Sequence, residues 1–228
     1  MEQQAKIFLA GERGITETSW FRSCNTFNFG HYQNKHKTPV ENLYVLNDDT
    51  LAGGKSLAMT IEEPTHVLLI PVVGTVEYKD SNGNAAIIQS GQLHYSLLQK
   101  RTAYTITNPY EKELVNFLQV WIKAGDKQEK NITQQFSFDI DANKNSLVNT
   151  GPETLKFCIG KLDGRNETVL HLNKTLNAAF VFVIQGAFET NGVLLHARDG
   201  LALWNHAVIE MEALSNEAII GVIILENN

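Results

Sequence analysis

Long apolar runs and cysteines are both scarce in this chain of 228 residues. The longest apolar stretches cover only residues 67–73 and 219–225, whereas a helix needs about 20 apolar residues to cross a bilayer. Cys24 and Cys158 are too few for a disulfide scaffold or a thiolate zinc site. The opening Met1-Glu2-Gln3-Gln4 is polar and acidic, unlike a signal peptide. We therefore expect a cytoplasmic protein with buried, reduced thiols and no membrane segment.

Positive charge is also in short supply. The chain has 19 Lys and Arg against 25 Asp and Glu, for a net charge of -6, which argues against direct nucleic-acid binding. It contains no glycine-rich phosphate loop, no G-x-S-x-G elbow and no C-x-x-C pair. Nucleotide hydrolysis, serine esterase chemistry and thiol redox chemistry therefore lack their usual residues.

What the sequence does contain is a β pattern. Short segments rich in Val, Ile, Thr, Phe and Tyr alternate with turn signals, which predicts an all-β sandwich or barrel. The strongest hairpin signals are Asn82-Gly83 and Asn191-Gly192, because Asn and Gly readily take the positive φ angles of tight turns. With 43% hydrophobic residues, the chain can fill one large core or two small ones.

The two hairpins lie in segments of similar order. In each half an apolar strand ends at a glycine, an Asn-Gly turn follows, and another glycine opens the next strand. The residues are Gly74, Asn82-Gly83 and Gly91 in the first half, and Gly186, Asn191-Gly192 and Gly200 in the second. This pattern is typical of a duplicated barrel unit, although two unrelated glycine-bounded hairpins would look the same.

Histidines and carboxylates are the remaining candidates for chemistry. None of the seven His forms an H-x-H pair, which would place two imidazoles on one face of a strand. Glu62 and His66 share a strand parity with Thr60, so all three could face inward. Glu62 is either a functional carboxylate in an apolar cavity or a solvated residue at a barrel mouth, and His66 is expected to be a hydrogen-bonded strand histidine. Phe27, Phe29 and Tyr44 are expected to be packing residues.

Several longer motifs resemble the pirin family of bicupins, in particular bacterial pirin-like proteins with quercetinase activity. The motifs are Ser-Cys-Asn-Thr-Phe-Asn-Phe at 23–29, Leu-Tyr-Val-Leu-Asn-Asp-Asp at 43–49, Gly-Thr-Val-Glu-Tyr-Lys-Asp-Ser-Asn-Gly-Asn at 74–84, Leu-Gln-Val-Trp-Ile at 118–122 and Gly-Leu-Ala-Leu-Trp at 200–204. The resemblance implies two tandem cupin barrels of the double-stranded β-helix, jelly-roll type. We predict an N-terminal barrel over residues 1–124 and a C-terminal barrel over residues 125–228.

The resemblance also implies one divalent metal, such as iron, in the first barrel of the relatives. Its ligands are an H-x-H pair on one strand and a His and a Glu two residues apart on a later strand. Counted from the hairpin motif, these positions hold no matching ligand. They are Thr60, Glu62, Tyr104 and Ile106. We therefore expect no metal cofactor and a pocket in which Glu62 and Tyr104 make polar contacts, with Thr60 and Ile106 forming its wall.

Three functions remain open. The first is a non-catalytic, monomeric protein that binds a small molecule in the N-terminal barrel or regulates a protein partner. The second is an enzyme. It would be a quercetinase-type dioxygenase with a metal site rebuilt from Glu62, His66 and His94 or His31, or an acid/base catalyst using Glu62 with Tyr104. The third is a scaffold whose pocket is filled by side chains.

Overall fold

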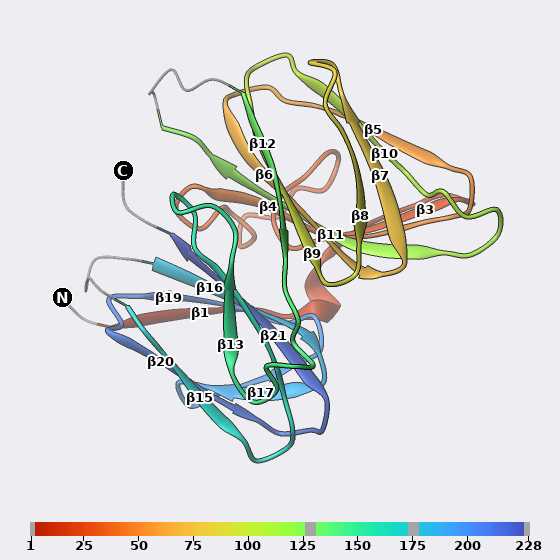
Figure 1. Ribbon diagram of the computed structural model, residues 1–228. Coiled ribbons are helices and arrows are strands. Elements are labelled where there is room, and N and C mark those ends of the chain that lie inside the picture. The colour runs from red at the N-terminus through yellow and green to blue at the C-terminus, as the bar shows by residue number, and fades with distance from the viewer. Residues whose placement is uncertain (1–2, 126–130, 173–177, 226–228) are drawn as a thin grey trace. The chain divides into compact units, whose positions relative to one another are not determined.

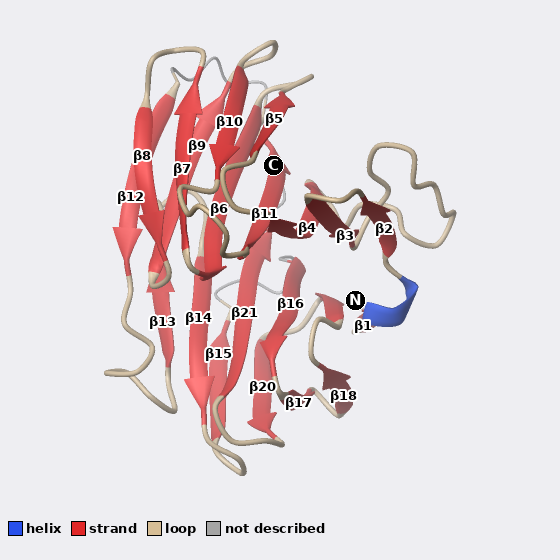
Figure 2. Ribbon diagram, turned by 90° about the vertical axis from the view of Figure 1, so that its right-hand side faces the viewer, coloured by secondary structure: helices blue, strands red, loops and turns tan. Residues whose placement is uncertain are grey.

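The computed structural model describes residues 3–125, 131–172 and 178–225 (Figure 1). Strands make up nearly all of its regular structure, together with one short 3-10 turn at η1 (Ala10–Glu12), so the all-β prediction is confirmed (Figure 2). No helix in the described ranges is long and apolar enough to cross a membrane. The chain divides into two compact units. The N-terminal unit is Gly14–Ser137, and the C-terminal unit joins Phe138–Asn228 to Met1–Arg13.

The N-terminal unit consists of two antiparallel sheets. The larger has the strand order β12-β9-β6-β11-β4-β3-β2, and the smaller has the order β5-β10-β7-β8. The strands are β2 Gly14–Glu17, β3 Phe21–Asn25, β4 Leu43–Leu51, β5 Ser56–Thr60, β6 Thr65–Val73, β7 Thr75–Asp80, β8 Ala85–Gln89, β9 Gln92–Leu98, β10 Ala103–Thr107, β11 Val115–Lys123 and β12 Ile132–Ser137.

The C-terminal unit repeats this plan. Its sheets have the orders β1-β19-β16-β21-β14-β13 and β15-β20-β17-β18. The strands are β1 Gln4–Phe8, β13 Leu147–Thr150, β14 Phe157–Leu162, β15 Glu167–His171, β16 Ala178–Gln185, β17 Ala187–Thr190, β18 Val193–His196, β19 Gly200–Trp204, β20 Val208–Ala213 and β21 Ala218–Leu225.

The internal duplication is visible in the strand order. Adding ten to each label converts β5-β10-β7-β8 into β15-β20-β17-β18, and β9-β6-β11-β4 into β19-β16-β21-β14. Both predicted hairpins are present, and Asn191 and Gly192 have φ angles of 47° and 77°. Gly74 and Gly186, with φ of 82° and 79°, make equivalent bends between two strands. The two Asn-Gly signals therefore belong to one structural unit that is used twice.

The division of the chain differs from the predicted domains 1–124 and 125–228. β1 pairs along its length with β19, and Phe8 packs on Phe180 with ring centroids 5.5 Å apart. β12 pairs with β9 of the N-terminal unit. In each unit an extra strand covers the hydrogen-bonding edge of the strand next to it, which would otherwise be exposed. Turn signals along the sequence do not reveal such pairings, because the partners lie far apart in the chain.

The two cores differ in composition. Aliphatic side chains dominate the core of the C-terminal unit, whereas that of the N-terminal unit includes Tyr78, Tyr104, Phe117 and Trp121. Trp121 makes edge-on ring contacts with Phe29 and Tyr44 at centroid distances of 5.7 and 5.9 Å. Together with the burial of Phe27, these contacts confirm the predicted packing role of the three aromatics.

Both cysteines are free thiols, but they are not equally buried. Cys158 is buried, as predicted, and burial raises the pKa of its thiol. Cys24 is partly exposed, which corrects the prediction for that residue. It alternates along β3 with Ser23 and Asn25, whose buried side chains lie on the other face of the strand.

Candidate functional site

The inner face of β5 in the N-terminal unit is defined by its pairing with β10. Tyr104 lies opposite Met59, and Ile106 lies opposite Leu57. Directly opposed residues of an antiparallel pair have their side chains on the same face, so Met59 and Leu57 share the face of Tyr104 and Ile106. Thr60 lies opposite Ala103, on the other face, and both residues are exposed.

The four predicted pocket residues therefore do not line one cavity. Tyr104 and Ile106 are buried in the core of the N-terminal unit, whereas Thr60 and Glu62 are exposed. A count of residues from the hairpin motif back to Thr60 crosses β6, which contains a register irregularity at residues 71–73 against β11. Side chains alternate between faces with a period of two, so a count alone cannot determine which face a residue occupies. Glu62 is exposed, so it is a solvated residue and not a carboxylate in an apolar cavity.

The core-facing residues on and directly after β5 and on β10 also do not provide the ligands that the divalent metal ion of the relatives would need. They offer one phenol, one thioether and two hydrocarbon side chains, in Tyr104, Met59, Ile61 and Ile106. Iron, nickel and copper are held in such sites by imidazole and carboxylate groups. Among the described residues, no three His, Cys, Asp or Glu side chains gather into a possible metal site. This donor set does not fit the metal that the resemblance implies.

The histidines considered for a rebuilt metal site lie apart. His66 forms a 2.9 Å hydrogen bond through Nδ1 with Tyr95 Oη, which confirms it as a hydrogen-bonded strand histidine. His94 lies opposite core residue Leu69 on the inner face, with its Nε2 3.1 Å from Ser96 Oγ. Since Val67 belongs to the core, its neighbour His66 lies on the opposite face of β6. His31 is exposed outside the core.

A hydrogen-bond chain occupies the interior of the N-terminal unit instead. Trp121 Nε1 donates to Tyr104 Oη over 2.9 Å, and Tyr104 Oη donates to Gln119 Oε1 over 2.7 Å. Gln119 Nε2 in turn donates to Asp49 Oδ2. Every donor in this chain points toward Asp49, so the carboxyl group is its final acceptor. The phenol oxygen of Tyr104 is thus already held between two protein groups.

Burial gives this chain unusual electrostatics. Asp49 is 0% exposed, and Gln119 and Tyr104 are each 1% exposed. Burial raises the pKa of Asp49 to about 7, and the negative charge of Asp48 raises it too, against the lowering effect of hydrogen bonds from Ser23 and Gln119. Burial also holds the pKa of Tyr104 well above its usual value of 10.0. The phenol is therefore neutral and acts only through hydrogen bonds at physiological pH.

The local sequence explains why polar groups enter this core. Val45 and Leu51 of β4 point into the core, and alternation places Asn47 and Asp49 on the same inner face. Register then aligns Asn25 with Asn47 and Gln119, and Ser23 with Asp49 and Phe117. We refer to Ser23, Asn25, Asn47, Asp49 and Gln119 as the polar block. Residues 43–49 form one of the family motifs, but the motif alone does not predict this site. The shared parity of Val45, Asn47, Asp49 and Leu51 is the sequence signal that could have revealed it.

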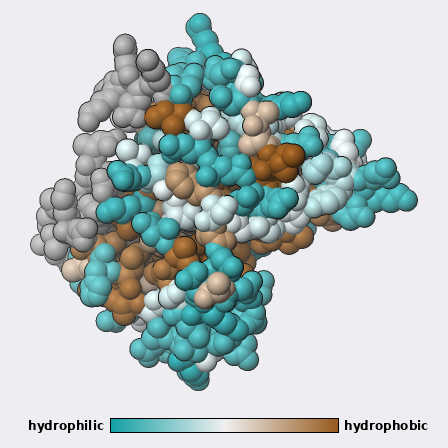
Figure 3. All heavy atoms as spheres, in the orientation of Figure 1, coloured by the Kyte–Doolittle hydropathy of each residue, from teal (hydrophilic) through white to brown (hydrophobic). Residues whose placement is uncertain are grey.

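A separate recess lies on the small sheet of the C-terminal unit. It has a volume of about 240 Å³ and an acidic lining. Glu167, Glu212 and Glu189 lie side by side across three strands of this sheet. The remaining lining residues are Thr168, Val169, Asn191, Gly192, Glu210 and Met211. Figure 3 shows mainly hydrophilic side chains over the part of this unit that contains β15 and β17.

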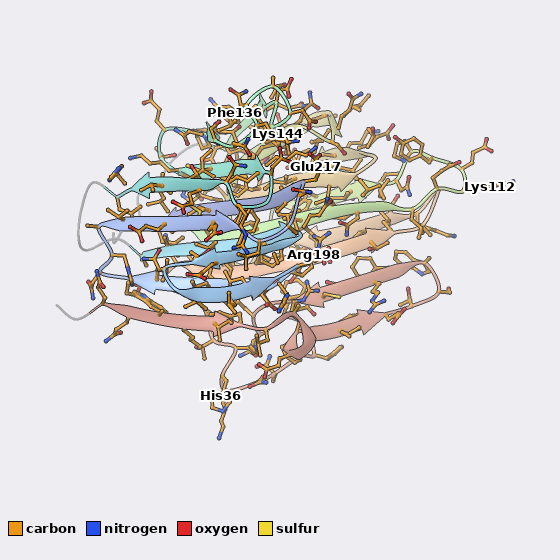
Figure 4. All side chains as sticks on the ribbon, turned by 90° about the horizontal axis from the view of Figure 1, so that it is seen from below. His36, Lys112, Phe136, Lys144, Arg198 and Glu217 are labelled. Atoms are coloured by element: carbon orange, nitrogen blue, oxygen red, sulfur yellow. The ribbon has the colours of Figure 1, made fainter. Side chains whose placement is uncertain are left out.

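The surface of the C-terminal unit also carries an ion-pair network. Lys144 contacts Glu217, and both side chains are labelled in Figure 4. Lys144 also lies 2.9 Å from Asp163, and Lys161 contacts both Glu217 and Asp141. Hydrogen bonds from the two lysines lower the pKa of Glu217 to about 2. These groups are solvated, so the network contributes little to stability and offers no site.

Two barrels of equal strand order in one chain define the protein as a bicupin. Residues 153–222 match the family described as the quercetinase C-terminal cupin domain. A protein named quercetin 2,3-dioxygenase from Escherichia coli K12 is 26% identical over 225 residues, covering 92% of this chain and 94% of that protein. These matches confirm the resemblance of this chain to the pirin family.

Solved structures show the same fold. YhhW from Escherichia coli has a TM-score of 0.87 and 21% identity, and the match covers 99% of both chains. The bacterial pirin YhhW in complex with nickel(II) has a TM-score of 0.83 and 22% identity, covering 99% of this chain and 100% of that one. The predicted fold of two cupin barrels is therefore confirmed.

Proposed function

We propose that this chain is a pirin-like bicupin that acts as a non-catalytic binding or interaction protein and not as a metal-dependent dioxygenase. The observation that carries the proposal is the arrangement around Tyr104. Its hydroxyl accepts a hydrogen bond from Trp121 and donates one to Gln119, and its neighbours across β5 are Met59 and Ile61. These side chains are packed and hydrogen-bonded to one another, so they support the structure of the core and are not arranged to bind a metal ion.

Core packing argues for a partner bound outside the first barrel. The large side chains Tyr78, Tyr104 and Phe117 are each no more than 1% exposed. Because Thr60 and Glu62 are exposed whereas Tyr104 and Ile106 are buried with these side chains, a protein partner or scaffold role is favoured over a small molecule held between the four residues. A rebuilt dioxygenase site would instead need the side chains of His66 and His94 to point toward one ion. His66 on β6 and His94 on the paired strand β9 point to opposite faces of the sheet.

The test is a metal and turnover measurement on the purified protein. The protein is incubated with Fe²⁺, Ni²⁺ or Cu²⁺, freed of excess ion, and analysed for bound metal and for loss of quercetin absorbance under air. The Escherichia coli protein named quercetin 2,3-dioxygenase is the positive control. We expect bound metal well below one ion per chain and quercetin loss no faster than in buffer with the same trace metal.

One outcome would overturn the proposal. It is stoichiometric metal with quercetin turnover, both abolished by Glu62→Ala or by His94→Ala. The matched control is His36→Ala, an exposed histidine that no proposed site includes. Loss of metal in the control as well would indicate adventitious surface binding and would leave the non-catalytic assignment standing.

A further inference from the structure

In the polar block, unpaired hydrogen-bond acceptors outnumber unpaired donors. Four buried side-chain atoms in it have no hydrogen-bond partner: Asn25 Oδ1, Asn47 Oδ1, Asn47 Nδ2 and Asp49 Oδ1. Three of them are oxygens and only one is a donor. A buried polar atom without a partner costs about 1–3 kcal/mol, so a group that supplies donors here would be stabilising.

The missing donor must occupy almost no space. The four unpaired atoms have essentially no surface that a water molecule could touch, and Asn25, Asn47 and Asp49 are each no more than 1% exposed. A bound water or metal ion needs a cavity of at least its own size beside these atoms. A proton needs none, and a protonated carboxyl group is a hydrogen-bond donor.

The surroundings of Asp49 also lack a compensating positive charge. Its hydrogen-bond partners on the flanking strands are Ser23 and Gln119, both neutral. Asp48 lies on the opposite face of β4, and its negative charge disfavours ionisation of Asp49. The other groups that face this interior are Asn25 and Asn47 on β3 and β4, Phe117 on β11, Leu69 and Val67 on β6, His94 and Ser96 on β9, Tyr78 on β7 and Tyr104 on β10. Burial lowers the pKa of His94 to about 4, so that ring is neutral as well.

We propose that the Asp49 carboxyl group is a proton-binding switch. In the protonated state, Oδ1–H of Asp49 donates to Asn47 Oδ1. Loss of this proton to solvent changes the hydrogen bonds that run from Asp49 through Gln119 and Tyr104 to Trp121. Asn25 and Asn47 are cross-strand neighbours, and a rotation of the Asn47 side chain in the protonated state would let its unpaired Nδ2 donate to the unpaired Asn25 Oδ1. Burial, which raises the pKa of Asp49 to about 7, agrees with this arrangement and places the switch near neutral pH. The inference stands independently of whether the protein has a catalytic function.

Ionisation changes the block in a defined way. When the Oδ1–H bond breaks and the proton leaves, Oδ1 becomes a charged acceptor that can no longer donate to Asn47 Oδ1. Repulsion between the two oxygens favours rotation of the Asn47 amide, so that Nδ2 faces Asp49. The charge also strengthens the hydrogen bond from Gln119 Nε2 and, through Gln119, polarises the bond from Tyr104. The indole N–H of Trp121, at the far end, therefore reports the state of Asp49.

The experiment is an NMR titration of the full chain between pH 5 and 9. Aspartate carboxyl carbons are labelled with ¹³C, and the Trp indole N–H resonances are followed in the same samples. Asp49→Asn identifies the Asp49 carbon and mimics the protonated state, because its amide can donate and accept like a neutral carboxyl. Asp48→Asn is the matched control, one residue away on the other face of the strand. Trp121→Phe identifies the indole resonance.

We expect one aspartate carbon to titrate with a midpoint near pH 7. It should be absent in Asp49→Asn and retained in Asp48→Asn. The Trp121 indole should shift with the same midpoint in the parent protein and stay constant in Asp49→Asn. In Tyr104→Phe the carboxyl midpoint should persist, while the indole should no longer follow it.

Any of three results would overturn the inference. In the parent protein, the absence of any aspartate carbon that titrates above pH 6 eliminates the proton site, even if Asp49→Asn does not fold. A carboxyl that titrates near pH 7 without a matching indole shift eliminates the coupling to Trp121. An indole that still follows the titration in Tyr104→Phe would likewise contradict transmission through the phenol.

Discussion

Tyr104→Phe is a direct perturbation of the hydrogen-bond chain in the N-terminal unit. The substitution keeps the ring in the core and removes only the hydroxyl oxygen. Trp121 Nε1 then loses its acceptor and Gln119 Oε1 loses its donor, and both atoms remain buried. Each unpaired buried group costs about 1–3 kcal/mol, so the variant should be destabilised by about 2–6 kcal/mol.

The assay is urea unfolding, followed by Trp fluorescence and by far-UV circular dichroism. The transition assigned to the N-terminal unit should move to lower urea concentration with an unchanged slope. The matched control is Tyr110→Phe, whose hydroxyl donates to Thr75 Oγ1 over 3.1 Å at an exposed site. There water replaces the lost partner, and the change in unfolding free energy should stay within about 0.5 kcal/mol.

A double-mutant cycle with Gln119→Met extends this test. If the two residues act in one hydrogen-bond chain, the double variant should lose less stability than the sum of the two single losses. Equal costs for Tyr104→Phe and Tyr110→Phe, or strict additivity in the cycle, would refute the conclusion that the buried phenol is held by both neighbours.

The other stability predictions concern Asp49 and the N-terminal strand. Burial raises the pKa of Asp49 in the folded state from 3.8 to about 7, so its stabilising effect is complete below about pH 4 and is lost as the pH rises to about 7. The loss amounts to about 4 kcal/mol, and Asp49→Asn should abolish this pH dependence in urea unfolding, whereas Asp48→Asn should retain it. Phe8→Ala should destabilise the C-terminal unit by about 3–5 kcal/mol in thermal unfolding, because Phe8 is 1% exposed and packs on Phe180. The exposed Ile15→Ala should have little effect, and similar losses in both variants would contradict the assignment of β1 to the C-terminal unit.

The position of β1 shows where sequence reasoning about domains reaches its limit. The alternation of apolar residues and the Asn-Gly turns predicted the strands and both hairpins, because these features depend on neighbouring residues. Pairing of Gln4–Phe8 with Gly200–Trp204 joins segments separated by most of the chain, and nothing local encodes it. The predicted boundary at residue 124 could not include that contact or the pairing of β12 with β9.

The sequence by itself determined the all-β class, the repeated hairpin unit and the absence of an H-x-H pair, since each follows from residue type and short spacing. Tertiary structure alone decided that Met59 rather than Thr60 faces Tyr104, and that Asp49, Gln119 and Tyr104 meet in one core. The physical reason is the two-residue period of a strand: register between strands assigns each side chain to water or to the interior, and register is fixed only when all the strands pair.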